Sequence, residues 1–419
     1  MEIKPVRNLD ATFEVPGSKS YTQRALVVAS LAEGKTHLTN ALISEDTRHL
    51  MEALRFLGAG IDVSGNEISV TGTQGRIHNP GRVLSLGNNG TALRFLTTLV
   101  ALGNGRFTLD GSSRLRERPV GPLLDALSML GVYSKSRRGC PPVEIDARGI
   151  NGGSVTFPDV ESSQYISSLL ISSPYAKSDI GIALAGRTVS EPYIGMTVDV
   201  IKRFGGDVIA KEENFFKIRS GRHYRGLRYI IEGDASSASY FFLAAAVCGG
   251  RVRVVGIDPA SLQGDIGIIP VMENLGCSVV RGDRWVDVTG GSLHEGNMVF
   301  DMGNMPDMVP TLAVLGAFRR GRTTITNVSH LRIKESDRIS ALVNELKKIG
   351  ADAGETADGL VVGGGKLHGA DIETYNDHRI AMSFAIAGLA VPGIRITDRR
   401  CVAKSFPGFW DELARLRED

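Results

Sequence analysis

The sequence lacks several features that would assign it to common protein classes. Its four cysteines, Cys140, Cys248, Cys277 and Cys401, lie far apart and form no CxxC or Cys/His spacing. No apolar run approaches the roughly 18 residues that a membrane span requires. The N-terminal residues have neither the apolar core of a signal peptide nor the acid-poor, Ser/Arg-rich composition of a transit peptide. We therefore predict a cytoplasmic protein with reduced thiols and no membrane association.

An excess of charge of one sign is also missing. The 48 Lys and Arg residues against 46 Asp and Glu residues leave a net charge of +2. A nearly neutral chain argues against a dedicated binder of nucleic acid, although cations can still be concentrated locally. There is no DxD motif, HExxH motif or His/Cys cluster, so we expect no metal and no other cofactor.

Glycine, by contrast, is abundant, at 50 of 419 residues, and some of these glycines mark a repeat. Apolar residues stand eight, four and one positions before Gly58, Gly131, Gly276 and Gly350, and less completely before Gly205. These offsets place the apolar side chains on one helix face, and a glycine at that point suits a left-handed C-cap. The five glycines are 71 to 74 residues apart, which predicts units of strand, helix, strand, helix and hairpin.

A sixth unit is expected at the C-terminus, where Phe409, Leu413 and Leu416 repeat the apolar offsets shortly before the chain ends. We expect residues 3–15 to supply its strands as two short β runs. The first helix of each unit is predicted to start at small or polar residues, namely Ser18, Asn89, Ser162, Ser236, Asp307 and Asp377. Six units divide naturally into two domains of three, which we place at 15–233 and at 1–14 with 234–419.

Several of the predicted helix starts are rich in cations and hydrogen-bond donors. Lysine or arginine is locally unfavourable at a helix N-terminus, whereas a bound anion would make it favourable. Each group is also compatible with an ordinary turn and cap when it is taken alone. The groups are Lys19, Ser20 and Arg24, then Asn88, Gly90, Thr91 and Arg94, and finally His378 and Arg379.

Two acidic residues stand out among these cations. Lys334 and Arg338 are four residues apart and share a helix face, with Glu335 between them. Glu335 could form an ordinary ion pair with Arg338, or it could carry a proton beside a bound anion. Asp307 opens an otherwise apolar helix, either as a partner of the helix dipole or as a base. The combination favours a small polyanionic substrate pair and acid–base chemistry between two closing domains.

Eight runs along the whole chain closely resemble the 5-enolpyruvylshikimate-3-phosphate (EPSP) synthase family of enolpyruvyl transferases. They are PGSKSYTQRAL, LGNNGTALR, RERPVGPLLDAL, ESSQY, SEPYI, IKESDRI, YNDHRIAMSFAIAG and CVAKSFPGFW. The resemblance implies a two-domain inside-out α/β barrel of six βαβαββ-type repeats, grouped three plus three, with the active site in the interdomain cleft. It also implies a transferase of the shikimate pathway of aromatic amino acid biosynthesis, and a glyphosate target. The 5-hydroxyl of shikimate 3-phosphate would attack phosphoenolpyruvate, and phosphate would leave by addition and elimination. The expected partners are these two small molecules, and we expect a monomer.

The resemblance also implies roles for individual residues. Shikimate 3-phosphate would bind Lys19, Ser20, Arg24, Ser162, Ser163, Gln164, Ser190, Tyr193, Asp307 and Lys334. Phosphoenolpyruvate would bind Lys19, Asn88, Gly90, Arg118, Gln164, Arg338, Arg379 and Lys404. Asp307, Glu335 and Lys19 would be catalytic, with Asp307 as proton acceptor and Glu335 as proton-transfer partner. Thr91, Arg94, His330 and His378 are further candidates.

Two positions depart from the family pattern, and two other functions remain as alternatives. His330 stands where many members carry Asn, and Phe95 stands where a Pro is common, next to the helix start that holds Gly90. One alternative is the related transferase that acts on UDP-N-acetylglucosamine, but its reactive cysteine is absent from the run DGSSRLRER. The other alternative is a non-catalytic repeat scaffold that binds polyanions, which would not need Asp307 and Glu335.

Overall fold

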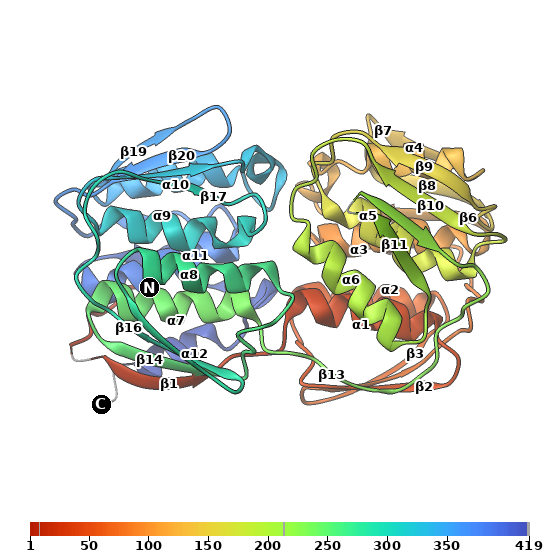
Figure 1. The fold of residues 1–419 in the computed structure, drawn as a ribbon. Coiled ribbons are helices and arrows are strands. Elements are labelled where there is room, and N and C mark those ends of the chain that lie inside the picture. Colours follow the sequence, from red (N-terminus) through yellow and green to blue (C-terminus); the bar gives the residue numbers. More distant parts are fainter. Residues whose placement is uncertain (8, 213, 417–419) are drawn as a thin grey trace. The chain divides into compact units, whose positions relative to one another are not determined.

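A computed structural model describes residues 1–7, 9–212 and 214–416 of the chain. The chain divides into two compact units, Gly17–Ile231 and Met1–Pro16 with Glu232–Asp419 (Figure 1). Each unit has its own hydrophobic core. Helices and strands alternate in both units, which confirms the α/β class.

The unit Gly17–Ile231 contains three segments with the same order of elements. The first has α1 (Lys19–Leu31), β2 (Lys35–Thr39), α2 (Glu45–Phe56), β3 (Gly60–Ser64) and β4 (Glu67–Thr71). The second has β5 (Val83–Ser85), α3 (Gly90–Ala101), β6 (Asn104–Asp110), η1 (Leu115–Glu117), α4 (Gly121–Met129), β7 (Tyr133–Arg137) and β8 (Cys140–Arg148). The third has β9 (Gly153–Phe157), α5 (Ser163–Ser172), η2 (Ser173–Tyr175), β10 (Ile180–Leu184), α6 (Pro192–Arg203), β11 (Val208–Glu212) and β12 (Phe215–Ile218), and β13 (Arg228–Ile230) follows.

The other unit repeats this order, except that its third segment has no hairpin in the part of the chain that the structure describes. Its first segment has α7 (Ala235–Cys248), β14 (Arg251–Val255), η3 (Gly264–Gly267), α8 (Ile268–Asn274), β15 (Ser278–Gly282) and β16 (Trp285–Thr289), and it is joined by β1 (Asp10–Glu14). Its second has β17 (Met298–Asp301), η4 (Pro306–Met308), α9 (Val309–Ala317), β18 (Arg322–Thr326), η5 (Ser329–Ile333), α10 (Arg338–Lys348), β19 (Asp352–Glu355) and β20 (Leu360–Gly363). Its third has β21 (Asp371–Ile372), α11 (His378–Ala390), β22 (Arg395–Ile396), η6 (Arg400–Lys404) and α12 (Phe409–Arg415).

Five sheets share one four-stranded topology. In each of them a parallel pair of strands is extended by an antiparallel hairpin, as in the order β5-β6-β8-β7. In this sheet α3 connects the parallel strands β5 and β6, so this repeat is a βαβ unit followed by a helix and a hairpin. The remaining pair, β21 and β22, is parallel.

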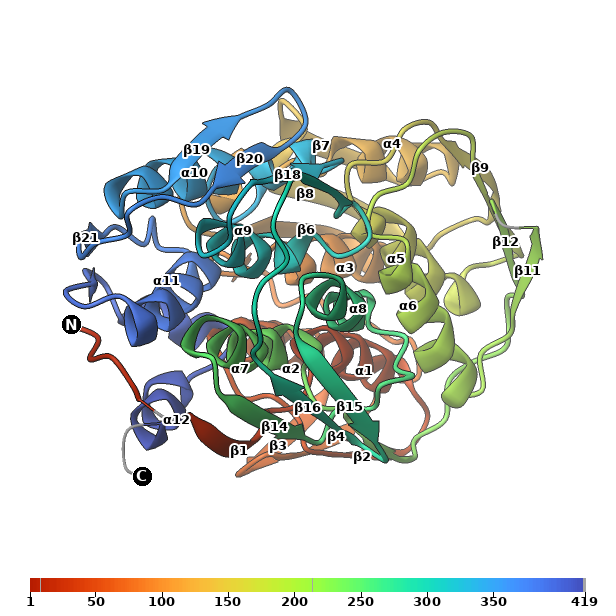
Figure 2. The ribbon, with the colours of Figure 1, turned by 60° about the vertical axis from the view of Figure 1, so that its left-hand side comes forward.

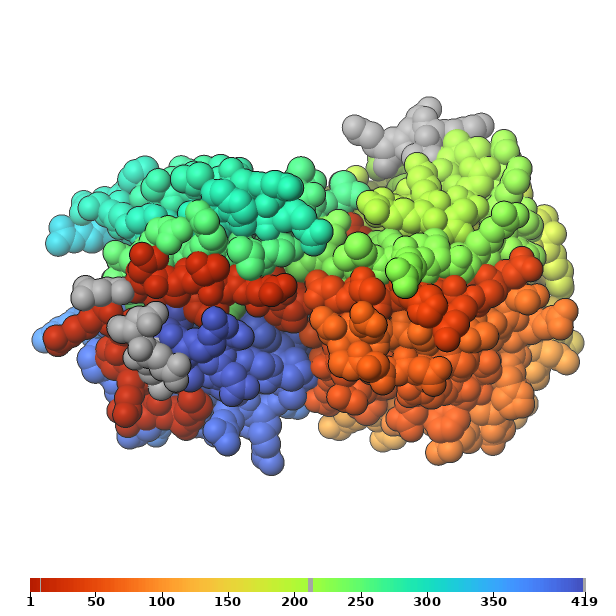
Figure 3. All heavy atoms as spheres, turned by 90° about the horizontal axis from the view of Figure 1, so that it is seen from below, coloured from red at the N-terminus to blue at the C-terminus, as the bar shows by residue number. Residues whose placement is uncertain are grey.

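The N-terminal strand does not complete the sixth unit as expected. β1 pairs in parallel with β14, in register from Asp10 with Arg251 to Glu14 with Val255, and so completes the fourth sheet. Only the first residues reach the sixth unit, where Glu2 bridges Arg395 and Ile396 N–H donates to the Met1 carbonyl. Figure 2 shows this N-terminal segment near β21, and Figure 3 shows it on the surface, in red, beside residues from the C-terminal part of the chain, in blue. One of the two expected β runs is therefore a single bridge, and Asn8 lies outside the described residues.

Central helices of each unit are buried on nearly all sides. Helices α7 and α11 contact each other and α9, and α3 contacts α5, so the cores are formed by helix-to-helix packing. Strands instead alternate buried and accessible residues, as β8 does along Cys140–Arg148. None of the helices in the described residues is both long and apolar enough to span a membrane.

The predicted helix ends are largely confirmed. Gly58, Gly131, Gly205, Gly276 and Gly350 all have positive φ values, between 81° and 105°. The side chains of Ser18, Asn89, Ser162 and Asp377 accept from backbone N–H groups at the starts of α1, α3, α5 and α11. Two starts were placed wrongly. Asp234, not Ser236, caps α7, and Asp307 lies in the short helix η4 that precedes α9, because a Pro at each of positions 306 and 310 favours a separate first turn.

Candidate active site

The starts of α10 and α11 bring together a carboxylate–arginine cluster, which consists of Asp307, Glu335, Arg338, Asp377 and Arg379. Arg338 is the first residue of α10, and only 1% of its side chain is exposed. Its guanidinium donates to three carboxylates, with Nη1 2.9 Å from Asp307 Oδ1, Nη2 2.8 Å from Glu335 Oε2, and Nε 2.7 Å from Asp377 Oδ2. Burial alone would lower the pKa of Arg338, but these carboxylates outweigh burial and raise it.

Asp307 connects this arginine to a second one. Its Oδ2 accepts from Nη2 of Arg379 at 2.6 Å, while its Oδ1 accepts from Arg338. Arg379 also donates to the hydroxyls of Ser236 and Tyr240, each at 3.3 Å. Asp307 thus joins the two buried arginines through its two carboxylate oxygens.

Asp377 fixes both helices of the cluster. It is fully buried, accepts from Arg379 N–H at 3.0 Å as the N-cap of α11, and accepts from Ser336 Oγ at 3.1 Å as well as from Arg338. His378 is also fully buried, with Nδ1 3.8 Å from the Asp377 carboxylate. The sequence had indicated Asp377 only as a helix start, because its contact to α10 joins residues 39 positions apart.

His330 and Lys404 lie on the 3-10 helices η5 and η6 of the same unit, and Lys334 directly follows η5. His330 is buried on η5, and neither of its ring nitrogens has a hydrogen-bond partner among the described residues. Burial, and secondarily Lys334, lowers the pKa of His330 to about 3, so the imidazole is neutral near pH 7. Lys404 is buried on η6.

In the unit Gly17–Ile231, Asn89 holds together the starts of three helices. Its Nδ2 donates to Gln23 Oε1 on α1 at 2.8 Å and to the Asp46 carbonyl on α2 at 2.7 Å, while its Oδ1 accepts from Ala92 N–H on α3. Lys19 Nζ is 3.3 Å from Asp46 Oδ2 in the same region. Gln23, Asp46 and Asn89 were not among the predicted site residues. The one signal in the sequence was Asp46, an acidic residue in the first turn of a helix.

Gln164 is fixed by two of the predicted residues. Arg94 Nη1 donates to Gln164 Oε1 at 3.0 Å, and Gln164 Nε2 donates to Thr91 Oγ1 at 3.0 Å. Arg118 donates to the Asn88 carbonyl at 3.2 Å. A Cβ placed on Gly90 would lie 2.5 Å from Arg94 Nη1 and 2.6 Å from Arg118 Cζ, so the absence of a side chain at residue 90 lets both guanidiniums approach the start of α3. Arg94 and Thr91, which the sequence ranked as further candidates, therefore belong to the same arrangement as Gln164.

Arg24 lies between two aromatic rings and makes several hydrogen bonds within the protein. Its guanidinium donates to Thr197 Oγ1 at 2.7 Å, to the Ser20 carbonyl at 3.0 Å and to the Tyr193 carbonyl at 3.1 Å. It lies 5.5 Å from the centre of the Phe95 ring and 5.7 Å from that of Tyr193. Phe95 therefore packs against a predicted site residue. Burial lowers the pKa of Arg24 to about 10, which leaves it charged near pH 7.

Three of the predicted serines, Ser162, Ser163 and Ser190, lie at the start of α5 or just before α6. Ser162 caps α5 and Ser163 is its first residue, and both are buried. Ser190 is buried before α6 and adopts φ 59°, a left-handed conformation that is unusual for a residue other than glycine. Such strained residues are concentrated at functional sites.

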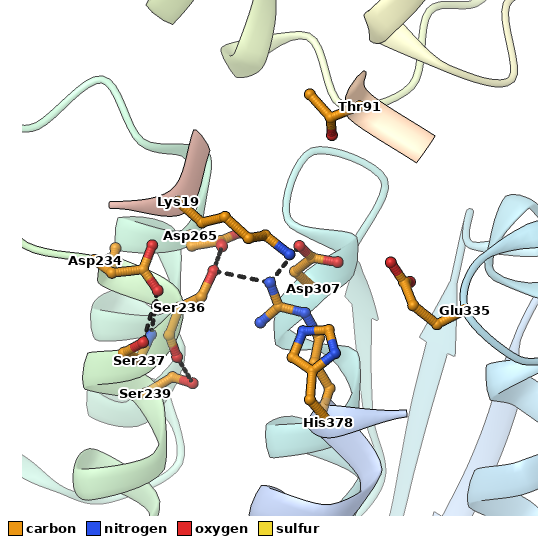
Figure 4. Close-up of polar contacts among 12 residues, drawn as sticks. Lys19, Thr91, Asp234, Ser236, Ser237, Ser239, Asp265, Asp307, Glu335 and His378 are labelled. Atoms are coloured by element: carbon orange, nitrogen blue, oxygen red, sulfur yellow. Dashed lines mark hydrogen bonds and ion pairs between the residues drawn. The ribbon is translucent and has the colours of Figure 1, made fainter. Parts of the chain in front are cut away.

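The sequence reasoning missed Asp265, which is buried beside the carboxylate–arginine cluster. Its Oδ2 accepts a hydrogen bond from the Ser236 hydroxyl, and Figure 4 shows these two side chains pointing toward each other. Burial, and then the neighbouring Asp307 carboxylate, raises the pKa of Asp265 to about 7. No motif marks this residue, since η3 is a four-residue turn.

Among the described residues, the surface arginines near residue 115, the possible metal ligands and the cysteines form no further site. Arg114 and Arg116 pair with Glu117 and Asp110 at the surface, whereas Arg118 beside them is buried. Within the described residues, no three His, Cys, Asp or Glu side chains are grouped as a metal site. The free thiols of Cys248 and Cys277 have a pKa raised to about 11, and that of Cys401 to about 12, mainly by burial.

Comparison with known proteins gives one consistent result. The family model described as EPSP synthase (3-phosphoshikimate 1-carboxyvinyltransferase) matches residues 3–413. A 3-phosphoshikimate 1-carboxyvinyltransferase from Shewanella loihica is 41% identical over 100% of this chain and 99% of its own. One from Nostoc punctiforme is 43% identical over 98% of this chain and 97% of its own. The solved EPSP synthase of Acinetobacter baumannii superposes with a TM-score of 0.81 at 29% identity, covering 99% of this chain and 97% of its own.

Proposed function

Because the chain belongs to the EPSP synthase family, we propose that it transfers the enolpyruvyl group of phosphoenolpyruvate to the 5-hydroxyl of shikimate 3-phosphate and releases phosphate. The observation that carries this proposal at the level of side chains is Asp307, which is shared by two buried arginines. It combines cations for an anionic substrate with a carboxylate that can accept a proton.

Charge explains why both arginines are needed. The two substrates together carry two phosphates and two carboxylates, and their mutual repulsion has to be offset by fixed cations. Arg338 and Arg379 are already ordered by carboxylates, so a carboxylate of phosphoenolpyruvate can take over contacts of the same geometry. Asp307, released from part of these contacts, would accept the proton of the 5-hydroxyl. Glu335, 2.8 Å from Arg338 Nη2, would transfer a proton at the methylene carbon.

Residues of the unit Gly17–Ile231 are proposed to bind the same substrates. Lys19, Ser20, Arg24, Ser162, Ser163, Ser190 and Tyr193 would hold shikimate 3-phosphate, and Asn88, Gly90 and Arg118 would hold phosphoenolpyruvate, with Gln164 contacting both. From the other unit, Lys334 would contact shikimate 3-phosphate and Lys404 phosphoenolpyruvate, with His378 as a helper. The finer fold proposal is an inside-out α/β barrel of three repeats in each of two domains. Its support is the helices buried in each core and the repeated sheet topology. We also propose that the protein is a cytoplasmic monomer.

His330 is proposed to contact the shikimate ring although it replaces a common Asn. A neutral imidazole has one donor and one acceptor, and both nitrogens lack partners among the described residues. A substrate hydroxyl would satisfy such a group, which is otherwise costly to bury.

The related transferase acting on UDP-N-acetylglucosamine is not favoured. The run Asp110–Arg118 contains no cysteine, and burial raises the pKa of the Cys248, Cys277 and Cys401 thiols. Thiols with a raised pKa are poor nucleophiles at neutral pH.

The function is tested by phosphate release with each substrate alone and with both together. We expect release only when phosphoenolpyruvate and shikimate 3-phosphate are both present, because the hydroxyl must add before phosphate can leave. Release with UDP-N-acetylglucosamine in place of shikimate 3-phosphate would overturn the proposal, and so would no release at all.

The same assay tests the acid–base pair. Asp307→Ala and Glu335→Ala should each lower turnover by about a hundredfold or more, the usual contribution of a general acid or base. The matched control is Asp301→Asn, because Asp301 lies at the end of β17 and accepts only from groups of its own turn and Asn327 in the contacts resolved. Near-normal turnover of both alanine variants would show that Asp307 and Glu335 do not carry the proton transfers, whereas a polyanion-binding scaffold predicts no turnover even for the wild type.

A further inference from the structure

Ser236, at the start of α7, and Asp265, on η3, are buried next to Arg379. Ser236 lies in the first turn of α7, and its hydroxyl donates to Asp265 Oδ2. The same Ser236 oxygen accepts from Arg379 Nη2 at 3.3 Å. Since Arg379 Nη2 also donates to Asp307, a continuous chain of contacts runs from Asp265 to the proposed base.

The hydrogen bonds of this chain run from Arg379 to Ser236 and from Ser236 to Asp265. Arg379 can only donate, so Ser236 must accept from it and has its single proton available for Asp265. If Asp265 were absent, that proton could turn elsewhere, including toward the guanidinium, and the contact to Arg379 would weaken. Asp265 thus fixes which side of the Ser236 hydroxyl faces the arginine.

The segment that carries Asp265 is itself firmly anchored. Gln263 Nε2 donates to the Gly233 carbonyl at 2.8 Å, and Gln263 Oε1 accepts from Ala235 N–H at 3.2 Å. Asp234, the cap of α7, accepts from both N–H and Oγ of Ser237. Figure 4 shows Asp234, Ser236, Ser237 and Asp265 around this helix start. The position of Asp265 relative to Ser236 is therefore set on both sides.

Burying this carboxyl has a cost that simple capping of α7 does not require. Asp234 already caps the helix, whereas burial and the Asp307 carboxylate raise the pKa of Asp265 to about 7, against the opposing effects of Arg379 and Ser236. A buried acid with a strongly perturbed pKa beside a cluster of charges is typical of functional sites.

We propose that Asp265 and Ser236 are positioning residues for the reaction, which hold the Arg379 guanidinium in place for phosphoenolpyruvate and, through it, the Asp307 carboxylate. This inference rests on the proposed function. It assigns the pair to one substrate, because Arg379 belongs to the proposed phosphoenolpyruvate site, whereas most of the proposed contacts to shikimate 3-phosphate come from the unit Gly17–Ile231.

The test is a double-mutant cycle with Ser236→Ala, Asp265→Ala and the double variant, measured as kcat and as KM for each substrate. Each single variant should raise KM for phosphoenolpyruvate roughly tenfold, as expected for a lost hydrogen bond to a charged group, and leave KM for shikimate 3-phosphate within about twofold. The double variant should be no worse than the singles, because both residues act through one contact. Ser239→Ala is the matched control, since Ser239 is a buried serine one turn later on α7 that bonds to the Ser236 carbonyl and Thr311.

Several results would overturn this role. A purely structural cap predicts a lower melting temperature with unchanged KM values, or equal changes in both KM values, and independent roles predict additive effects in the double variant. If Asp265→Ala does not fold, Asp265→Leu replaces it, because leucine keeps a similar volume but accepts no hydrogen bond, and it should raise the same KM. Wild-type enzyme in the same assay separates the outcomes, since an inactive wild type refutes the proposed function and an active wild type with unaffected variants refutes only the positioning role.

Discussion

Single residues in the carboxylate–arginine cluster show how burial and charge are balanced. Arg338 is buried yet charged because three carboxylates contact it. A buried ion pair of this kind contributes little net stability, but removal of one partner is costly because it leaves a charge without compensation. The cluster is therefore better explained by the anionic substrates it would bind than by the stability of the fold.

His330 represents the opposite case, a buried group that avoids charge. Its pKa of about 3 in the folded protein lies far below the value of about 6.5 usual for an unfolded chain. Between these two values the unfolded chain binds a proton that the folded protein excludes, so the free energy of unfolding falls as the pH is lowered through that range.

His330→Asn should remove this pH-dependent loss. When the pH is lowered from 8 to 5, the wild type should lose about 2 kcal/mol of unfolding free energy through His330. The variant should not show this loss, because asparagine does not titrate. Urea unfolding at the two pH values measures this difference, and each protein at pH 8 is its own control. The same shift in both proteins would show that His330 is not the group that titrates.

At the scale of elements, the turn before α11 depends on contacts from α10. Tyr375 and Asn376 both have φ 53°, a left-handed conformation that costs a residue other than glycine about 1–2 kcal/mol. Glu345, fully buried on α10, accepts from Tyr375 Oη at 2.8 Å and from Glu373 N–H at 3.1 Å. Lys348 donates to the same carboxylate at 2.8 Å. Glu345 therefore holds the strained turn that leads directly into Asp377.

Tyr375→Phe should loosen this turn. Loss of one hydrogen bond to a buried carboxylate should lower the free energy of unfolding by about 2 kcal/mol, and it should raise KM for phosphoenolpyruvate because Asp377 and Arg379 follow the turn. Urea unfolding and steady-state kinetics measure the two effects. Tyr133→Phe is the control, since Tyr133 is 61% exposed on β7. A stable Tyr375→Phe enzyme with unchanged KM would mean that helix α11 alone fixes Asp377.

Elements were predictable where their cause is local. Gly58 and Gly350 end helices because the apolar offsets and the left-handed residue lie within one stretch of nine residues. Ser18 and Asn89 were identified as caps for the same reason. The contacts of Asp265 with Ser236 and of Asp377 with Arg338 join residues 29 and 39 positions apart. They depend on how the helices pack, which the pattern of a single segment does not encode.

At the scale of the whole molecule, the net charge of +2 conceals an uneven distribution. Arg24, Arg94, Arg338 and Arg379 are buried in the first two turns of their helices, and Arg118 is buried between η1 and α4. Buried charge is costly unless it is compensated. The net charge contains no information on where the cations lie. The recurrence of lysine and arginine at predicted helix starts did indicate their position.

The pairing of β1 could not be predicted from the repeat. In the other repeats the strand before the first helix pairs with the strand after it, as β5 does with β6. β1 precedes α1 but pairs with β14, and β13 precedes α7 but pairs with β2. These two strands are thus exchanged between the first and fourth repeats, and each completes a sheet in the unit to which it belongs.

This exchange predicts which fragments fold. The fragment Gly17–Ile231 contains every strand of its three sheets, including β13. The fragment 232–419 lacks β1 and the fully buried Phe13, whose ring stacks on Phe241 at 4.2 Å between centroids. Deleting a buried phenylalanine side chain alone costs about 3–5 kcal/mol, which is a large part of the stability of a typical domain.

We therefore expect cooperative urea unfolding for 17–231 and none for 232–419. A permuted version of the second fragment, in which residues 232–419 are followed by a flexible linker and then by residues 1–16, should regain cooperativity. In this chain β1 can again pair with β14. The same permuted chain with Phe13→Ala is the matched control, and it should unfold at lower urea with a similar slope. Cooperative unfolding of 232–419 without β1, or failure of 17–231 to fold, would show that the exchanged strands do not define the folding units.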